Sequence, residues 1–258
     1  MYKKLFGTLP VKQDEEKAEQ DDDKNTVSRE RTSAMSITKE TLDFMVENRI
    51  QNSRIWFQEH RQEYIEHVKA PLTELAERLE PCIRSIDPEL ITNPSRVVSR
   101  INRDTRFTKD KSLYRDVMWV AFTRDKKVHE SPCGFVMEFS PMGFRYGCGY
   151  WQAPPKVMEA LREMVLENDP VFRKAQQAYE GQQHFVLEGD CYKRSRYPEQ
   201  PENMRLWLDR KNMDFMHNSK DFKLLFSEEL AQVLAEGFQQ LIPMYQMFTR
   251  AEQKAKKG

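Results

Sequence analysis

The spacing of apolar residues changes character twice after the first 36 residues of the chain. A helix is predicted to begin at Thr38, and a longer helical pattern covers 53–79, with Pro71 expected to kink or end it. In the middle of the chain, short apolar runs of strand length replace this spacing, and helical spacing returns after Pro154. Helices, a block of strands and helices again favour an α+β fold over alternating βαβ units.

The central block predicts a meander of antiparallel strands. A strand-like segment begins at 97–101, and further segments lie at 117–122, 135–139 and 144–151. The last two are joined by Ser140-Pro141-Met142-Gly143, which is typical of a hairpin turn. We therefore expect an antiparallel sheet of three or more strands with helices packed mainly on one face.

Composition divides the chain into three parts. Residues 10–36 are polar with an acidic centre, and such a segment cannot bury enough apolar surface to offset its ordering entropy. We expect a disordered acidic tail over 1–36, with an interaction arm as the alternative reading. A single α+β domain is expected over 37–250, with helices at 154–167, 170–179 and 221–248, followed by a basic tail at 251–258.

Net charge and composition argue against several functional classes. Lys and Arg total 41, as do Asp and Glu, so the chain has no global footprint for nucleic acid or a membrane. Four scattered cysteines without a C-x-x-C pair indicate free thiols in a reducing cytoplasm rather than a zinc site. With 9 glycines and neither a P-loop nor a dinucleotide fingerprint, no cofactor or metal is expected.

The segment 100–115 carries a local excess of charge. It holds six basic and two acidic residues, 6 − 2 = +4, in a protein of zero net charge. Arg100, Arg103, Arg106 and Lys109 recur every third residue. One turn of α- or 3₁₀-helix would place these side chains on one stripe that attracts an anion, whereas an extended segment would alternate them. The interleaved acids leave a structural ion-pair network as an open alternative, and a nucleic-acid surface as a third.

This segment also resembles a known family. The pattern Arg-x-x-Arg-Asp-x-Arg-Phe, followed by Asp-Lys and Tyr, occupies Arg100, Arg103, Asp104, Arg106, Phe107, Asp110, Lys111 and Tyr114. It is similar to the hallmark of an uncharacterised bacterial family catalogued as domain of unknown function 2461, many members of which have Pro at the position of Leu113 and Lys at that of Arg115. The likeness covers about 38–250 and extends to Asn52, Arg54, Trp56, Phe57, Tyr64, Gly147, Gly149, Trp151, Gly189, Lys193 and Arg194. The resemblance implies one domain and no particular reaction.

The leading hypothesis is a basic cleft that binds a small anionic ligand bearing phosphate or carboxylate. Its predicted ligand-binding residues are Arg100, Arg103, Arg106, Lys111 and Tyr114. If the protein is an enzyme, which the sequence leaves open, the candidates for proton transfer are Asp104, Lys111 and Tyr114. The alternative is a non-enzymatic interaction or scaffold protein that meets an unidentified partner through its acidic tail or C-terminal helix.

A second basic cluster, Lys193-Arg194-Ser195-Arg196, is expected in a loop. If it folded against 100–115, the two clusters would form one electropositive pocket. The five histidines show no ligand spacing or catalytic motif, and we expect surface or half-buried positions for them.

Overall fold

The computed structural model describes residues 36–106, 108–129 and 132–256. The chain divides into two units, Met1–Ala34 and Met35–Gly258, and the described residues all belong to the second. The predicted acidic tail at 1–36 therefore lies almost entirely outside the described residues.

Five strands form one antiparallel sheet with the order β1-β2-β3-β5-β4. Their bounds are β1 (Met118–Thr123), β2 (Gly134–Ser140), β3 (Gly143–Gly149), β4 (Val186–Glu188) and β5 (Asp214–Ser219). The predicted strands at 117–122, 135–139 and 144–151, and the turn between the last two, are confirmed. Because the sheet is wholly antiparallel and is combined with helices, the fold is α+β, as the sequence predicts.

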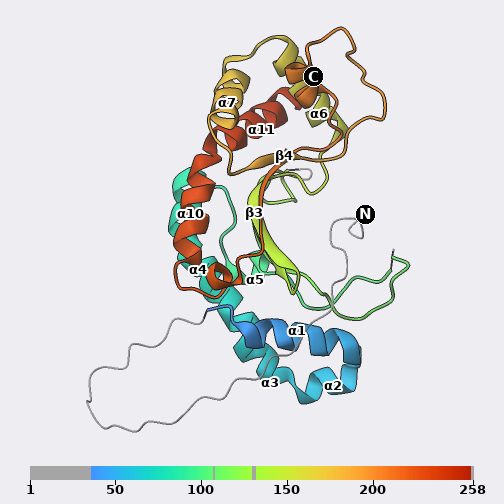
Figure 1. The fold of residues 1–258 in the computed structure, drawn as a ribbon, viewed down its shortest axis with the longest axis vertical. Coiled ribbons are helices and arrows are strands. Elements are labelled where there is room, and N and C mark those ends of the chain that lie inside the picture. Colours follow the sequence, from blue (N-terminus) through green and yellow to red (C-terminus); the bar gives the residue numbers. More distant parts are fainter. Residues whose placement is uncertain (1–35, 107, 130–131, 257–258) are drawn as a thin grey trace, which may run out of the picture. The chain divides into compact units, whose positions relative to one another are not determined.

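Helices precede β1, separate β3 from β4 and β4 from β5, and follow β5 (Figure 1). Before the sheet lie α1 (Lys39–Gln51), α2 (Arg54–Glu59), α3 (Arg61–Tyr64), the π-helical η2 (Ile65–Lys69), α4 (Ala70–Ile86) and α5 (Pro94–Val97). After β3 come α6 (Pro155–Leu166), α7 (Pro170–Glu180), α8 (Glu202–Leu208), α9 (Phe222–Leu225), α10 (Leu230–Gln240) and α11 (Ile242–Ala255). Pro71 is the second residue of α4, which continues directly from η2, so the helical stretch does not end there. The His67 carbonyl, four residues before Pro71, accepts the Thr41 hydroxyl at 2.5 Å in place of the amide that proline lacks. No helix in the described part of the chain has the length and apolar character needed to span a bilayer.

The strand predicted to begin at 97–101 is wrong. Pro94 starts a short helix, α5, because the Asn93 side chain accepts a hydrogen bond from the Ser95 amide at 3.0 Å and caps it. Only Val98 then pairs with the sheet, through an isolated bridge to Val120. Apolar content alone had suggested a strand, whereas the Asn-Pro pair decides the local structure.

The single long helix predicted over 221–248 is also wrong. The chain instead forms α9, α10 and α11, with a break at Leu241 directly before α11. Pro243 lies in the first turn of α11, where it suits a helix start but could not continue α10, since proline donates no amide hydrogen. The last helix runs to Ala255 and includes part of the segment assigned to a basic tail.

The main core lies between one face of the sheet and the C-terminal helices. Phe135 of β2 contacts Phe238 of α10 and Tyr245 of α11, each with ring centroids 5.1 Å apart, and Phe215 contacts Phe248 at 5.8 Å. Helices α4 and α10 lie along this side of β3 in Figure 1. Alternate residues on the strands face the opposite way and are only half-buried, so the opposite face of the sheet is available for polar side chains.

Candidate functional site

Residues 100–115, called the basic hairpin below, fold back on themselves next to β1. The Arg103 amide donates to the Leu113 carbonyl and the Arg115 amide to the Ile101 carbonyl, both at 2.8 Å, around a bridge between Asn102 and Tyr114. The segment therefore forms neither the helical turn nor the single extended run considered from sequence. The stripe of every third cation does not form.

Asp110 organises the base of the basic hairpin. Its Oδ1 accepts hydrogen bonds from the Ser112 hydroxyl at 2.6 Å and the Ser112 amide at 2.9 Å. Its Oδ2 accepts from Arg49 Nη2 at 2.8 Å and also from Arg103 Nη1. The Ser112 bonds and the two guanidinium groups hold the pKa of Asp110 well below its usual range. This carboxylate thus stays ionised and serves two arginines at once.

A second pair lies within the hairpin loop. Arg106 donates to Asp104 through Nε at 3.0 Å and through Nη2 at 2.7 Å, and the Arg106 amide also donates to Oδ1 at 3.1 Å. These bonds lower the pKa of Asp104 to about 2 and raise that of Arg106. Both side chains are more than half exposed, at 51% and 76%. The pair fixes the direction of the guanidinium while leaving it open to solvent.

The remaining predicted site residues have different surroundings. Lys111 Nζ donates to the Thr105 carbonyl at 2.8 Å, which closes the loop internally. Tyr114 is buried, stacks on Phe57 with centroids 5.0 Å apart, and its pKa is raised by burial. Arg100 is exposed, and its side chain has no ion pair with any described residue.

The structure therefore brings the motif into one hairpin without directing all its side chains at one point. Arg103 lies at the base, Arg106 and Lys111 lie in the loop, and Tyr114 packs underneath. The candidates for proton transfer, Asp104, Lys111 and Tyr114, are each engaged in internal contacts. Their assignment to a ligand or a reaction stays a prediction.

The N-terminal helices hold the hairpin from below. Asn52, which ends α1 with a left-handed φ of 46°, accepts a hydrogen bond from the Leu113 amide at 2.7 Å. Phe57 contacts both Tyr114 and Tyr64, the latter at 5.4 Å. The upstream residues that carry the family resemblance thus meet the motif in space. Sequence reasoning missed Arg49, which also donates to the Tyr114 carbonyl at 2.8 Å, because nothing local distinguishes it from other surface arginines.

Cations outnumber carboxylates in this cluster. Seven cations, Arg49, Arg100, Arg103, Arg106, Lys109, Lys111 and Arg115, accompany the carboxylates of Asp104, Asp110 and Asp116, so the formal balance is 7 − 3 = +4. Lys109, like Arg100, is exposed and has no acidic partner among the described residues. The internal pairs therefore order the hairpin without neutralising it.

A polar row continues from the hairpin across the half-exposed face of the sheet. The Arg115 guanidinium lies 4.5 Å from the ring centre of Trp119 on β1 and donates to the Arg100 carbonyl. Trp119 is paired in register with Glu138, which accepts from Arg145 Nε at 2.6 Å. Arg145 also bonds Glu188 of β4 at 3.3 Å. Beyond Arg115, which is already counted with the hairpin, this row holds one arginine and two glutamates, in contrast to the hairpin.

Asp214 lies beside this row but differs from its residues in burial and in pKa. It is largely buried, its Oδ1 has no hydrogen-bond partner in the described residues, and burial together with nearby Glu188 raises its pKa to about 6. Among the residues that the structure describes, no three His, Cys, Asp or Glu side chains are arranged to hold a metal ion.

The second basic cluster packs elsewhere. The Arg196 amide donates to Asp209 at 3.0 Å, and its guanidinium lies 3.9 Å from the ring centre of Tyr192. Within the described ranges no hydrogen bond or ion pair joins this cluster to the basic hairpin, so their contacts do not assemble the combined pocket considered from sequence.

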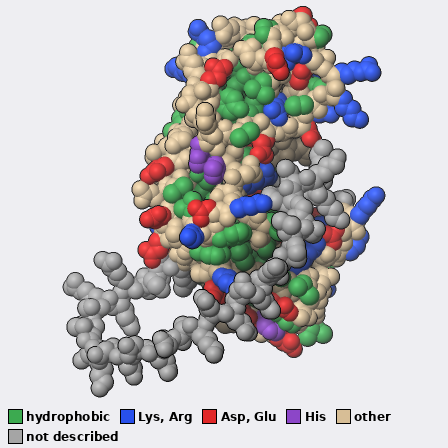
Figure 2. All heavy atoms as spheres, viewed as in Figure 1, with side chains coloured by type: hydrophobic (Ala, Val, Ile, Leu, Met, Phe, Trp, Pro, Cys, Tyr) green, Lys and Arg blue, Asp and Glu red, His purple; other side chains and the backbone are tan. Residues whose placement is uncertain are grey.

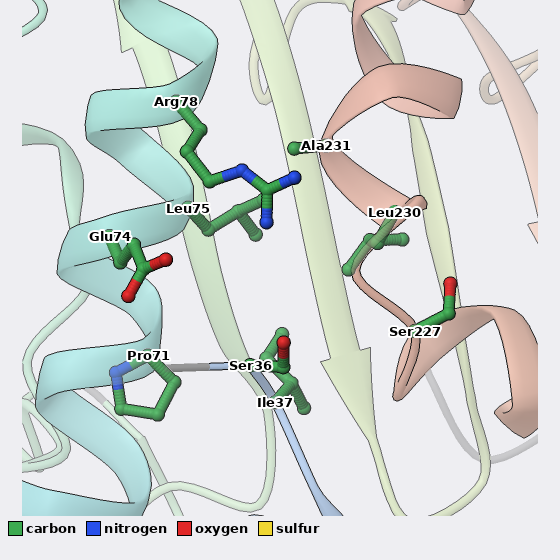
Figure 3. A pocket seen from close by; sticks show the side chains of 9 residues that line it. All are labelled: Ser36, Ile37, Pro71, Glu74, Leu75, Arg78, Ser227, Leu230 and Ala231. Atoms are coloured by element: carbon green, nitrogen blue, oxygen red, sulfur yellow. The ribbon is translucent and has the colours of Figure 1, made fainter. Parts of the chain in front are cut away.

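A small hollow lies between α4 and the start of α10 (Figure 3). Leu75 and Arg78 of α4 face Leu230 and Ala231 there, and Ile37 lines the hollow as well. Its volume of about 20 Å³ suffices for a water molecule but not for a metabolite.

Comparison with known protein families identifies the family of this chain. A family model described as "Conserved hypothetical protein (DUF2461)" matches residues 40–247, which include the basic hairpin, all five strands and the helices that support them. No curated protein matches the chain.

Proposed function

The chain belongs to the DUF2461 family of conserved hypothetical proteins, as its motif predicted, and from this premise we propose that the basic hairpin binds a small anionic ligand bearing phosphate or carboxylate groups. The observation that supports the proposal is the balance of +4, which remains after the internal ion pairs are counted. Clustered cations that lack acidic partners repel one another, and an oxyanion relieves this repulsion.

The ordered pairs would serve the binding by fixing the donors. Asp110 holds Arg49 and Arg103, and Asp104 holds Arg106, so these guanidinium groups lose little conformational freedom when a ligand arrives. Arg100 and Lys109 then supply the charge that the protein itself leaves unpaired. We propose binding without a reaction, because the three candidates for proton transfer make internal contacts.

A scaffold function is the second candidate, and a specific observation favours it. Asp110 and Asn52 tie the hairpin to α1, so the motif could exist only to fasten the N-terminal helices to the sheet. In that case Asp110 variants would loosen the hairpin, and no anion would stabilise the protein.

The surface supports a small anion over nucleic acid. Figure 2 shows Lys and Arg interspersed with Asp and Glu over the face in view, rather than one extended basic patch. A polyanion needs many phosphate contacts spread over such a patch, whereas the hairpin offers a compact cluster. We further place the protein in the bacterial cytoplasm, where its four free cysteines would remain reduced.

A thermal-shift screen with phosphorylated and carboxylic metabolites tests the proposal. The proteins compared are the wild type, Arg100→Gln/Lys109→Gln, and the charge-matched control Lys126→Gln/Lys127→Gln, which changes exposed lysines between β1 and β2. Since ligands that bind the native state raise Tm, the active compounds should stabilise the wild type and the control more than the hairpin variant. Equal shifts in all three proteins, or no shift with any compound, would contradict the proposal.

A further inference from the structure

Two histidine rings stack against each other where residues 181–185, the segment that joins α7 to β4, meet the sheet. The rings of His184, in this segment, and His217, on β5, are nearly parallel, at 5°, and their centroids are 3.8 Å apart. His217 Nδ1 donates to the His184 carbonyl at 3.0 Å. His184 Nε2 lies 2.7 Å from the hydroxyl of Tyr146 on β3. The stack and these two hydrogen bonds tie the segment to the sheet.

Tyr146 is a fixed partner for His184. The tyrosine is buried, and Gly237 of α10 lies so close that a Cβ there would be 2.6 Å from Tyr146 Cε2. Burial, together with nearby Glu236, raises the pKa of Tyr146 to about 12, so its hydroxyl keeps its proton. Among the described residues, His184 Nε2 is the hydroxyl's only hydrogen-bond partner. The hydroxyl therefore donates to a neutral His184 ring.

A proton on His184 Nε2 removes this acceptor. The protonated nitrogen can only donate, so the buried Tyr146 hydroxyl loses the partner for its own hydrogen, which is costly. The new charge also lies against the His217 ring, and a second charge on that ring would be repelled at this separation. Burial and His217 accordingly lower the pKa of His184. The geometry therefore favours two neutral rings.

The surroundings of the pair do little to compensate a charge on it. The rings packed against the histidines, those of Tyr146 and Phe185, carry no charge. From α10, Glu236 acts on Tyr146, but this carboxylate is exposed and accepts a hydrogen bond from Gln232 at 2.9 Å. Because water screens an exposed carboxylate, Glu236 offsets only a small part of the cost of protonating the pair.

We propose that His184 and His217 form an acid-sensitive latch, which holds residues 181–185 on the sheet while both rings are neutral and loosens them when the pair takes up protons. Histidine suits this function because its charge changes close to neutral pH. The loosening extends to β4, an edge strand of three residues whose Val186 is 53% exposed. This edge of the sheet thereby responds to pH, independently of the proposed function of the basic hairpin.

Hydrogen exchange of the full-length protein, followed by mass spectrometry at about pH 7.5 and about pH 5, tests the latch. Exchange is expressed as protection relative to an unstructured peptide at the same pH, which removes the intrinsic effect of pH. Because the pKa of His184 is lowered from its ordinary 6.5, the latch is complete above that pH and weakens as the pH falls below it. We expect the protection of residues 181–188 to fall about tenfold, and that of the central strand β2 to change less than about twofold.

Three variants separate the latch from a general effect of acid. His184→Gln keeps a polar side chain that cannot become charged, so the protection of residues 181–188 should vary less than about twofold with pH. Tyr146→Phe lacks the hydroxyl that loses its acceptor, and its fall should be smaller than that of the wild type. The matched control His129→Gln, which changes a histidine between β1 and β2, should keep the wild-type fall. A pH-independent wild type, or an equal fall in wild type and His184→Gln, would overturn the proposal.

Discussion

Two clusters built from the same residue types show how differently the protein uses Asp and Arg. In the interior, Asp87 accepts hydrogen bonds from Arg124 Nε at 2.8 Å and from the Tyr245 hydroxyl at 2.5 Å, and Glu89 lies 3.3 Å from the same guanidinium. Here one buried carboxylate matches one arginine, since the Asp87 side chain is only 8% exposed whereas that of Glu89 is 65% exposed. In the basic hairpin the cations outnumber the acids, and the Asp110 side chain is 45% exposed.

The difference separates a structural cluster from a candidate binding site. A buried cluster must be matched, because a charge without a partner inside the protein is strongly destabilising. An exposed cluster can keep an excess, because water screens it until a ligand binds. Burial and the ratio of cations to carboxylates, rather than the presence of arginines, are the reasons why we propose the hairpin as an anion-binding site.

The largest effect should come from breaking the buried cluster. Asp87→Asn leaves the half-buried Arg124 without its main partner, so we expect a loss of about 3 kcal/mol in the free energy of unfolding. Tyr245→Phe removes one donor to the same carboxylate and should cost about 1 kcal/mol. Urea denaturation at neutral pH measures both. A loss below about 1 kcal/mol for Asp87→Asn would show that this cluster is as weak as a surface pair.

The next effect concerns Asp214, a buried carboxyl that is neither matched nor exposed. Its pKa in the folded protein is about 6 against an ordinary value of 3.8. The contribution of this carboxyl to the free energy of unfolding is therefore complete below about pH 4 and is lost as the pH rises through 6. Asp214→Asn should therefore be more stable than the wild type at pH 8, by up to about 3 kcal/mol, and the gain should shrink toward pH 4. Denaturation curves across this range provide the measurement, and a gain that does not vary with pH would refute the assignment.

A smaller loss is expected for Asp110→Asn in the hairpin. The pKa of Asp110 is lowered in the folded state, so its stabilising effect is present above about pH 4 and fades at lower pH. High salt should also shrink the difference from wild type, since these ion pairs are exposed. If Asp110→Asn destabilised the protein as much as Asp87→Asn at every salt concentration, the contrast between the clusters would fail.

The smallest effect on stability should come from the unpaired cations. Arg100→Gln/Lys109→Gln removes charges that have no acidic partner in the described structure, so the free energy of unfolding should stay within about 0.5 kcal/mol of wild type. A slight gain would follow from reduced repulsion. A loss above 1 kcal/mol in urea denaturation would instead assign these side chains to the scaffold.

The sequence predicted the parts of the fold that depend on local patterns. Strands β1 to β3 are visible in the sequence as short runs rich in apolar and aromatic residues, and the structure buries mainly alternate residues along them. Strand β5 contains His217 and Asn218, and β4 has three residues, so neither produces a strand pattern. Their place in the sheet depends on tertiary pairing with β3 and with each other.

In the candidate site, too, the sequence predicts local contacts but not contacts between distant segments. The pair of Asp104 and Arg106 is two residues apart, and the interleaved charges indicated such pairing. The contact of Asp110 with Arg49 spans 61 positions and depends on how α1 packs. Sequence reasoning could therefore propose an ion-pair network but could not find its helical partner, nor decide which cations would remain unpaired.

The most direct test of the charge excess is a calorimetric titration with inorganic pyrophosphate. The proteins compared are the wild type, Arg100→Gln/Lys109→Gln and the control Lys126→Gln/Lys127→Gln. We expect saturable binding that weakens with salt, about tenfold lower affinity in the hairpin variant, and unchanged affinity in the control. Equal affinity in all three proteins, or no saturable binding at low salt, would contradict the account.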